Sequence, residues 1–161
     1  HRPGHFNGVA QVVSRLFDII KPNKAYFGLK DYQQVLIIKK MVEQLKMDVE
    51  IVPCPILRED DGLAMSSRNM LLSPEERKAA SLIPKVMQKA KEGAKATSLP
   101  ALKNELLAEL KKEPLLKPDY IEFCDAETLE SVSEMKQEQK IICLAAIFSG
   151  KIRLIDNVLI N

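Results

Sequence analysis

The sequence predicts an α/β fold, in which the end of a parallel-sheet domain precedes a small α+β domain. Helix and strand patterns alternate through residues 1–57, whereas residues 58–161 show helices followed by strands. Alternation with short links is typical of a parallel sheet. Helices followed by consecutive strands favour a helical layer on a largely antiparallel sheet. Because the composition also changes after Leu57, we expect one domain at 1–57 and a second at 58–161.

The first helix and strand are predicted within residues 1–28. Apolar residues recur at helical spacing through 6–20, and the Lys21-Pro22 pair ends the run. Residues 25–27 are apolar and are followed by Gly28, which predicts a strand with a turn after it.

A second helix and strand are predicted before residue 58. Apolar residues share one helical face through 35–45, and Asp31 is a plausible cap near the start. Residues 49–57 then predict a strand interrupted by Pro53 and Pro55.

The second half begins with a polar, glycine-containing loop at 58–69. Ser73-Pro74-Glu75-Glu76 has the pattern of a helix start, with proline at the first helical position and a glutamate three residues after the cap. We expect this helix to extend to about residue 92 and another to occupy 98–112. Three strands should follow, at 119–125, 140–148 and 151–160, with Ser149-Gly150 as a short link between the last two.

Composition and charge exclude several classes of function. The net charge of +2 and the dispersed basic residues argue against nucleic-acid or membrane-surface binding. The longest apolar run, "IICLAAIF", is too short to span a bilayer. Cys54, Cys124 and Cys143 have apolar neighbours and no metal-ligand spacing, which favours buried thiols in a reducing cytoplasm and no protein metal site.

The stretch "FGLKDYQQ" carries a candidate nucleotide site. Gly28 lies where a strand ends and a helix begins, and ligands of open α/β sheets bind at such edges. The helix start attracts anions, Lys30 suits a phosphate, and Asp31 suits the hydroxyls of a ribose. Gln34 lies one turn further on the same face. A capped helix with a solvated lysine is the alternative for this stretch alone.

Two more polar clusters suggest a polyanion and a small substrate. Ser66, Ser67 and Arg68 supply hydrogen-bond donors on a loop, which suits a pyrophosphate or triphosphate; a solvent-exposed interdomain loop is the alternative. In "RPGHF", His5 precedes a helix and is a candidate for orienting a substrate or for acid–base work. A packed or capping histidine is the alternative there.

Together these clusters resemble the pantoate–β-alanine ligase (pantothenate synthetase) family of the HxGH-containing nucleotidyltransferase superfamily. The resemblance rests on "RPGHFNGVAQVV", "AYFGLKDYQQ", "REDDGLAMSSRN" with "LSPEER", and "RLIDN", and it extends over essentially the whole chain. It implies a Rossmann-like nucleotide-binding domain followed by a smaller lid domain. It also implies a cytoplasmic enzyme, a homodimer when intact, with the small-molecule substrates pantoate, β-alanine and ATP, and with Mg²⁺ accompanying the ATP.

The resemblance implies a two-step ligation and a role for each matching residue. The carboxylate of pantoate attacks the α-phosphate of ATP, and the amine of β-alanine then displaces AMP from pantoyl adenylate. The catalytic positions would be Lys30, Ser66, Ser67 and Arg68. The ATP-binding positions would be Gly28, Leu29, Lys30, Asp31, Leu57, Met65, Ser66, Ser67 and Arg68, and the pantoate-binding positions would be Gln34, Arg2 and His5.

Two departures from the family pattern accompany this resemblance. Leu29 stands where the family usually has an acidic residue, so we retain it only as part of the ATP loop. The HxGH motif, with the proton-donor histidine of the family, is not among the 161 residues. We therefore expect this chain to be the C-terminal portion of a longer protein and to be unable to form pantothenate alone.

Two other interpretations remain open on the sequence. One is a different nucleotidyltransferase of the same superfamily, such as a cytidylyltransferase, which leaves Gln34 and "GHFNGV" unexplained. The other is a non-catalytic module that self-associates through the apolar faces of its first two helices. Assays with alternative acceptors separate the first interpretation from the ligase, and the dependence of mass on concentration tests the second.

Overall fold

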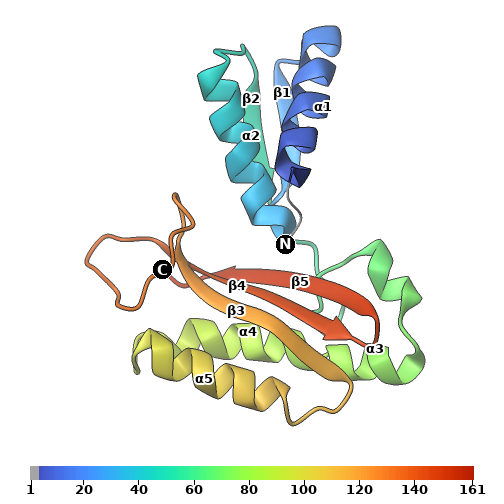
Figure 1. Ribbon diagram of the computed structural model, residues 1–161, viewed down its shortest axis with the longest axis vertical. Helices are drawn as coiled ribbons and strands as arrows, with labels where there is room; N and C mark the ends of the chain where they lie inside the picture. The colour runs from blue at the N-terminus through green and yellow to red at the C-terminus, as the bar shows by residue number, and fades with distance from the viewer. Residues whose placement is uncertain (1–3) are drawn as a thin grey trace. The chain divides into compact units, whose positions relative to one another are not determined.

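The computed structural model of the chain describes residues 4–161 and contains two compact units, His1–Ile56 and Leu57–Asn161 (Figure 1). Each unit has its own sheet and its own core. Among the described residues, no helix is both long and apolar enough to cross a membrane.

The N-terminal unit is a helix followed by a β–α–β segment. Its elements are α1 (His5–Ile20), β1 (Lys24–Gly28), the 3₁₀ turn η1 (Leu29–Asp31), α2 (Tyr32–Gln44) and β2 (Glu50–Cys54). The two strands pair in parallel, from Lys24 opposite Glu50 to Gly28 opposite Cys54. A parallel pair needs a crossover connection, and α2 lies within it. The predicted parallel α/β arrangement is therefore confirmed for these strands.

The core of the N-terminal unit is small. Phe17, Ile38 and Met41 form its buried cluster, with partly buried side chains from both strands packed around them, and Val35 of α2 is buried as well. Several large apolar side chains of this unit remain exposed, namely Val12, Leu16, Ile19, Ile20, Tyr26 and Leu45. The unit thus buries little apolar surface of its own.

The C-terminal unit packs helices on a three-stranded antiparallel sheet, as the sequence predicts. Its elements are η2 (Ser67–Leu71), α3 (Pro74–Ala80), α4 (Leu82–Gly93), α5 (Leu99–Leu110), β3 (Leu116–Asp125), β4 (Ile141–Ser149) and β5 (Ile152–Leu159). The strand order is β3-β4-β5. Helices α4 and α5 pack side by side against one face of the sheet (Figure 1). Their apolar faces and the strands form a core of 21 buried residues, including Leu106, Ile121 and Phe123.

The predicted helix over residues 73–92 is two helices, and that prediction is wrong in this respect. Its start is as expected, because Ser73 and Glu76 form a reciprocal capping box with proline in the first turn. The chain leaves α3 at Ser81 and begins α4 at Leu82. Pro84 lacks the N–H that would bond the carbonyl of residue 80, and its ring clashes with that carbonyl in a continuous helix.

Two local expectations also differ from the structure. Asp31 occupies the cap position of α2, but its side chain makes no capping hydrogen bond. The strand expected at 119–125 begins at Leu116, and an irregularity in pairing between Pro118 and Tyr120 accommodates the proline. Proline is tolerated in a strand at such irregularities because the missing N–H need not join the ladder.

Candidate functional site

In the N-terminal unit, the predicted nucleotide-binding residues lie together at the carboxyl end of β1. Gly28 is the last residue of the strand, and Leu29, Lys30 and Asp31 form the single 3₁₀ turn that follows. Gln34 lies in the first turn of α2 and is partly buried. An added Cβ at Gly28 would meet no atom within 4 Å, so the backbone is open to a close-fitting ligand there. Backbone amides and a helix start at a strand end favour anion binding.

In the C-terminal unit, residues 57–65 form a narrow hairpin that presents the second predicted cluster. The amide of Met65 donates to the carbonyl of Leu57 at 2.9 Å, and Glu59 N donates to Leu63 O at 2.8 Å. Gly62 closes the turn with a φ of +86°, a conformation in which a side chain is strained. The carbonyl of Leu57 therefore has a structural role, since it accepts a hydrogen bond that closes the stem of the hairpin.

A cavity of about 670 Å³ lies beside the end of this hairpin. Its lining residues are Glu59, Met65, Ser66, Ser67, Asn69, Met70 and Arg77. Three of these, Met65, Ser66 and Ser67, belong to the predicted phosphate-binding segment. Ser66 also caps the 3₁₀ turn, since its Oγ accepts from Arg68 N at 3.2 Å. The lining combines hydroxyl donors with the apolar side chains of two methionines.

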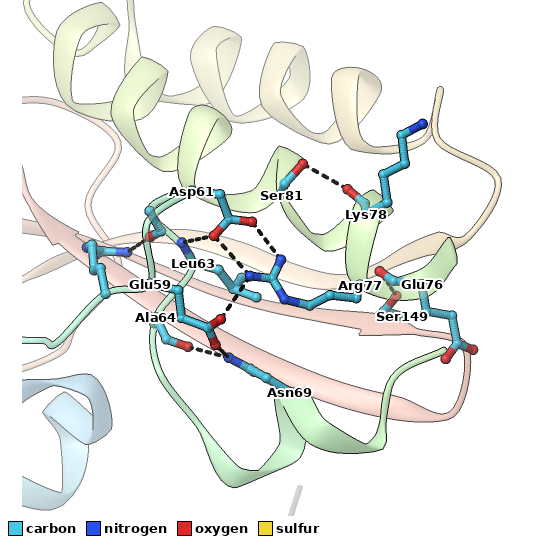
Figure 2. A network of polar contacts seen from close by, with 12 residues as sticks. Glu59, Asp61, Leu63, Ala64, Asn69, Glu76, Arg77, Lys78, Ser81 and Ser149 are labelled. Atoms are coloured by element: carbon cyan, nitrogen blue, oxygen red, sulfur yellow. Dashed lines mark hydrogen bonds and ion pairs between the residues drawn. The ribbon is translucent and has the colours of Figure 1, made fainter. Parts of the chain in front are cut away.

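A chain of polar contacts fixes the base of the segment that carries Ser66, Ser67 and Arg68 (Figure 2). Asn69, only 8% exposed, donates through Nδ2 to Glu59 Oε1 at 2.5 Å and to Ala64 O at 3.1 Å. The other oxygen of Glu59 accepts from Arg77 Nη2 at 3.0 Å. Arg77 in turn makes a forked contact with Asp61, at 2.6 and 3.1 Å. These contacts join α3 to both arms of the loop.

The same contacts shift the titration of the groups that make them. The hydrogen bond from Asn69, together with that from Arg77, lowers the pKa of Glu59 below its ordinary value. The Arg77 guanidinium lowers the pKa of Asp61, and the two carboxylates, Asp61 first, raise the pKa of Arg77. All three groups are therefore charged at neutral pH, and their formal charges sum to one negative charge beside the cavity.

A second ion pair anchors the start of the hairpin to the sheet. Arg58 donates to both carboxylate oxygens of Asp156 on β5, at 2.8 and 3.0 Å, and to Gly62 O at 2.9 Å. The Asp156 side chain is 1% exposed. A forked guanidinium–carboxylate contact fixes orientation as well as distance. The hairpin is thus fixed at its stem by Arg58 and at its far side by Arg77.

The remaining predicted residues have simpler surroundings. Arg68 is exposed, and none of the ion pairs within residues 4–161 involves it. His5 is the first residue of α1, is exposed, and has its ring 5.1 Å from that of Phe6. Arg2 lies outside the described residues. Lys30 belongs to the N-terminal unit and Arg68 to the C-terminal one.

Comparison with known proteins identifies the family. Residues 1–159 match the family model described as "Pantoate-beta-alanine ligase". The chain belongs to the pantoate–β-alanine ligase family. Among curated relatives of this ligase-family chain, a pantothenate synthetase from Caldicellulosiruptor bescii is 52% identical over 99% of the chain, and one from Fervidobacterium nodosum is 51% identical over 99%. The chain spans 57% of the length of each of these relatives.

Solved structures of the family support the same fold for this ligase-family chain. The pantothenate synthetase of Thermus thermophilus matches with a TM-score of 0.91 and 41% identity, over 99% of this chain and 57% of that one. A pantoate-β-alanine ligase from Francisella tularensis matches with a TM-score of 0.71 and 34% identity, over 98% of this chain and 51% of that one. That structure is described as complexed with β-γ ATP and β-alanine.

Four of the residues that line the cavity were not predicted from the sequence. They are Glu59, Asn69, Met70 and Arg77. Glu59 and Arg77 flank the predicted loop in "REDD" and "EER", and opposite charges on both sides of a polar loop were the available signal. The pairing itself bridges 18 residues, so no local spacing rule reveals it.

Proposed function

We propose that the protein carrying this chain condenses pantoate and β-alanine to pantothenate and converts ATP to AMP and pyrophosphate. The family match across residues 1–159 is the observation that carries the proposal. The Francisella relative described with an ATP species and β-alanine supports the same substrates. In this proposal residues 1–57 end the nucleotide-binding domain and residues 58–161 form a lid domain.

The proposed ATP site uses one segment from each unit. The amides around Gly28 and Leu29 would receive phosphate oxygens, Lys30 would neutralise them, and Asp31 would accept from the ribose hydroxyls. From the other unit, the backbone of Leu57 would contact adenine, and the segment from Met65 through Ser66 and Ser67 to Arg68 would surround the phosphates. In support, the 3₁₀ turn after β1 groups the first set and the cavity groups most of the second.

The proposed pantoate site lies on the same side of the N-terminal unit. Gln34 follows Lys30 and Asp31 by one helical turn, so its amide would reach a carboxylate or hydroxyl held beside the phosphates. His5 at the start of α1, and Arg2 before it, are proposed to line this site. Both residues carry groups that donate to a carboxylate.

The chemistry proceeds in two displacements. A carboxylate oxygen of pantoate attacks the α-phosphorus, the bond between that phosphorus and the bridging oxygen breaks, and pyrophosphate leaves. The β-alanine amine then attacks the acyl carbon, loses a proton, and displaces AMP. Because two anions meet in the first step, cations are needed where negative charge develops, and we assign this role to Lys30 and Arg68, assisted by the hydroxyls of Ser66 and Ser67.

Magnesium fits this site as a companion of ATP. Within residues 4–161, no group of three or more histidine, cysteine or carboxylate side chains is arranged to hold a metal ion. Mg²⁺ commonly binds through substrate phosphates, water and one or two carboxylates. We therefore propose that it arrives on the ATP phosphates, where it supplies further charge neutralisation.

Location and assembly are also proposed. The cysteines Cys54, Cys124 and Cys143 are free, which is consistent with a reducing compartment such as the cytoplasm. Homodimerisation follows from the family resemblance, and molar mass by light scattering across a concentration series tests it.

The decisive experiment follows an oxygen atom. The protein at its full natural length is incubated with ATP, β-alanine and pantoate labelled with ¹⁸O in its carboxylate. Attack of that carboxylate on the α-phosphate, followed by aminolysis, transfers one labelled oxygen to AMP. Labelled AMP together with pantothenate supports the proposal. Pantothenate with unlabelled AMP, or no pantothenate, would contradict it.

A pair of lysine variants tests the proposed site within the same assay. Lys30→Ala should lower kcat by more than it raises the KM for pantoate, because its contact strengthens as charge develops in the transition state. Lys24→Ala is the matched control, since Lys24 is the first residue of β1, the strand that leads to Lys30, and pairs with Glu50 at the surface. Equal kinetics for the two variants would remove Lys30 from the catalytic site.

A further inference from the structure

The polar contacts beneath the predicted phosphate loop lead directly to its backbone. Asn69 follows Arg68 in the 3₁₀ turn, and its amide N–H donates to Ser66 O at 2.9 Å. Its side chain donates to Glu59 and to the Ala64 carbonyl. We infer that Asn69, Glu59 and Arg77 are positioning residues that hold Ser66, Ser67 and Arg68 in the conformation that binds the phosphates of a nucleotide. The inference rests on the proposed function and assigns roles that it does not include.

In this series of contacts, Glu59 orients Asn69, and Arg77 orients Glu59. Glu59 uses one oxygen for Asn69 and the other for Arg77, so its carboxylate plane is fixed by contacts on two sides. Arg77 uses both terminal nitrogens on Asp61 and one of them also on Glu59. Arg77 extends from α3, whose first turn is held by the capping box of Ser73. The contacts of Arg77 therefore attach the loop to α3, and the capping box holds the first turn of that helix in place.

The charges of these groups argue against direct phosphate binding by Arg77. Its guanidinium is paired with two carboxylates, and the three groups together carry one negative charge. Direct binding of a phosphate by Arg77 would require its guanidinium to give up contacts with these carboxylates. Arg68 lies one residue before Asn69, is exposed, and has no carboxylate partner in the described part of the chain. Arg68 is therefore the arginine that can bind a ligand, whereas Arg77 is held in contacts within the protein.

The choice of asparagine at position 69 supports a positioning role. Its Oδ1 is buried, and no hydrogen-bond partner for it exists among residues 4–161. An unpartnered buried oxygen lowers stability, so Asn69 is a poor choice for packing alone. Its Nδ2, in contrast, joins Glu59 to a loop carbonyl on the opposite arm. An apolar residue of the same size would fill the space without making this connection.

The test compares two arginine-to-methionine variants in the protein at its full natural length. Arg77→Met cuts the chain of contacts below the loop. Arg153→Met is the matched control, because Arg153 lies in the same unit, is similarly exposed, and donates from Nε and Nη2 to Oδ2 of Asp119 at 3.0 and 2.9 Å. We expect Arg77→Met to raise the Kd and KM for ATP and lower kcat/KM for ATP by roughly 10- to 100-fold, the usual effect of a displaced binding group. The KM for pantoate should stay unchanged, and Arg153→Met should resemble wild type.

A second variant keeps the test decisive if Arg77→Met folds poorly. Glu59→Gln preserves the size of the side chain but weakens its contact with Arg77 and with the Asn69 amide. It should raise the KM for ATP several-fold. Amides of residues 66–72 should exchange with solvent faster, while those of β4 keep wild-type protection. A purely structural role would lower the active fraction, and hence kcat, without changing either KM.

The outcomes separate this inference from the proposed function. An active wild type whose Arg77→Met and Glu59→Gln variants keep the wild-type KM for ATP would overturn the inference alone. A wild type that forms no pantothenate would overturn the proposed function and the inference with it. A selective rise in the KM for ATP, with faster exchange confined to residues 66–72, would establish the positioning role.

Discussion

The two units of this chain differ in how firmly they support their polar segments. In the described part of the N-terminal unit, a cluster of three buried residues, Phe17, Ile38 and Met41, packs against a two-stranded sheet. In the C-terminal unit, 21 buried residues lie between a three-stranded sheet and its helices. The loop of the second unit is also fixed by forked ion pairs from Arg58 and Arg77. The C-terminal unit therefore carries most of the packing that can hold a site in place.

The difference shows two ways in which a polar segment can be held in place. At the end of β1, the strand runs directly into a 3₁₀ turn and then into α2, so regular backbone structure continues on both sides of the polar segment. In the 57–72 segment the backbone has no sheet to follow, since its own pairing is limited to one bridge between Arg58 and Ala64. Side-chain contacts from α3 and β5 replace the missing ladder. Variants matched across the two units test this contrast.

The largest effect is expected from removing the partner of the buried Asp156 carboxylate in the C-terminal unit. Arg58→Met leaves the Asp156 carboxylate, which is 1% exposed, without its forked partner. Breaking a buried pair from one side costs about 3–5 kcal/mol because an uncompensated charge remains. We expect the urea midpoint of the C-terminal unit, followed by circular dichroism, to fall accordingly.

The matched variant in the N-terminal unit is Lys24→Met. Lys24 pairs with Glu50 across the two strands, and more than half of each side chain is exposed. An exposed ion pair contributes about 0–1 kcal/mol, and salt screens it. If Lys24→Met destabilised its unit as much as Arg58→Met does the other, burial would not be what distinguishes the two pairs.

A somewhat smaller loss is expected from truncating a core side chain in each unit. Ile38 and Leu106 are both fully buried, and replacing either by alanine costs about 2–5 kcal/mol. Because the N-terminal core cluster has only three buried members among residues 4–56, Ile38→Ala should unfold that unit while the C-terminal unit keeps its amide protection. Leu106→Ala should lower the melting temperature without abolishing structure. Loss of protection in both units at once in Ile38→Ala would show that they fold as one.

Most of the fold follows from local patterns in the sequence. The apolar period of α1 and the strand-like run at β1 are local signals, and the predicted start of α3 is confirmed by its capping box. The break between α3 and α4 was missed because periodicity continues through it. Pro84 is the residue that indicates the break, because proline is tolerated in the first turn of a helix but not in its interior. The sequence alone does not say where α3 ends, so it does not say which of these positions Pro84 occupies.

The contacts around the cavity could not be predicted in the same way. Residues Ser66, Ser67 and Arg68 stand together in the sequence, and their shared location follows from their order. Glu59 and Arg77 are 18 residues apart, and their contact depends on the turn at Gly62 and on the direction of α3. Such pairs result from tertiary packing, for which a single sequence offers only complementary charges.

Two glycine substitutions should change stability moderately and in opposite directions: Gly150→Ala should lower it and Gly8→Ala should raise it. Gly150 has a φ of +55°, and an added Cβ would come within 1.8 Å of the Glu76 carboxylate that caps α3. Gly150→Ala should cost about 2 kcal/mol, from the strained backbone and the disturbed cap. Gly8 lies within α1, and a Cβ there meets no atom within 4 Å.

Gly8→Ala should therefore stabilise the N-terminal unit by about 0.5–1 kcal/mol, because alanine loses less chain entropy in a helix than glycine. Thermal unfolding of both variants, followed unit by unit through amide exchange, provides the measurement. A destabilising Gly8→Ala would indicate that the exposed side of α1 is packed against something in solution.

The smallest effect is expected at the end of β3 in the C-terminal unit. The Asp125 carboxylate accepts from the Gln139 side chain and from the amides of Thr128 and Glu127, and these contacts lower its pKa from 3.8 to about 2. A lowered pKa in the folded state means that the unfolded chain binds the proton more readily. The stabilisation is thus complete above about pH 4 and is lost as the pH falls toward about 2. Asp125→Asn should flatten this part of the pH profile of the urea midpoint while leaving the stability of the N-terminal unit unchanged. If the midpoint of the variant fell as steeply with pH as that of wild type, the acid sensitivity would belong to other carboxylates, such as Glu59 and Asp61.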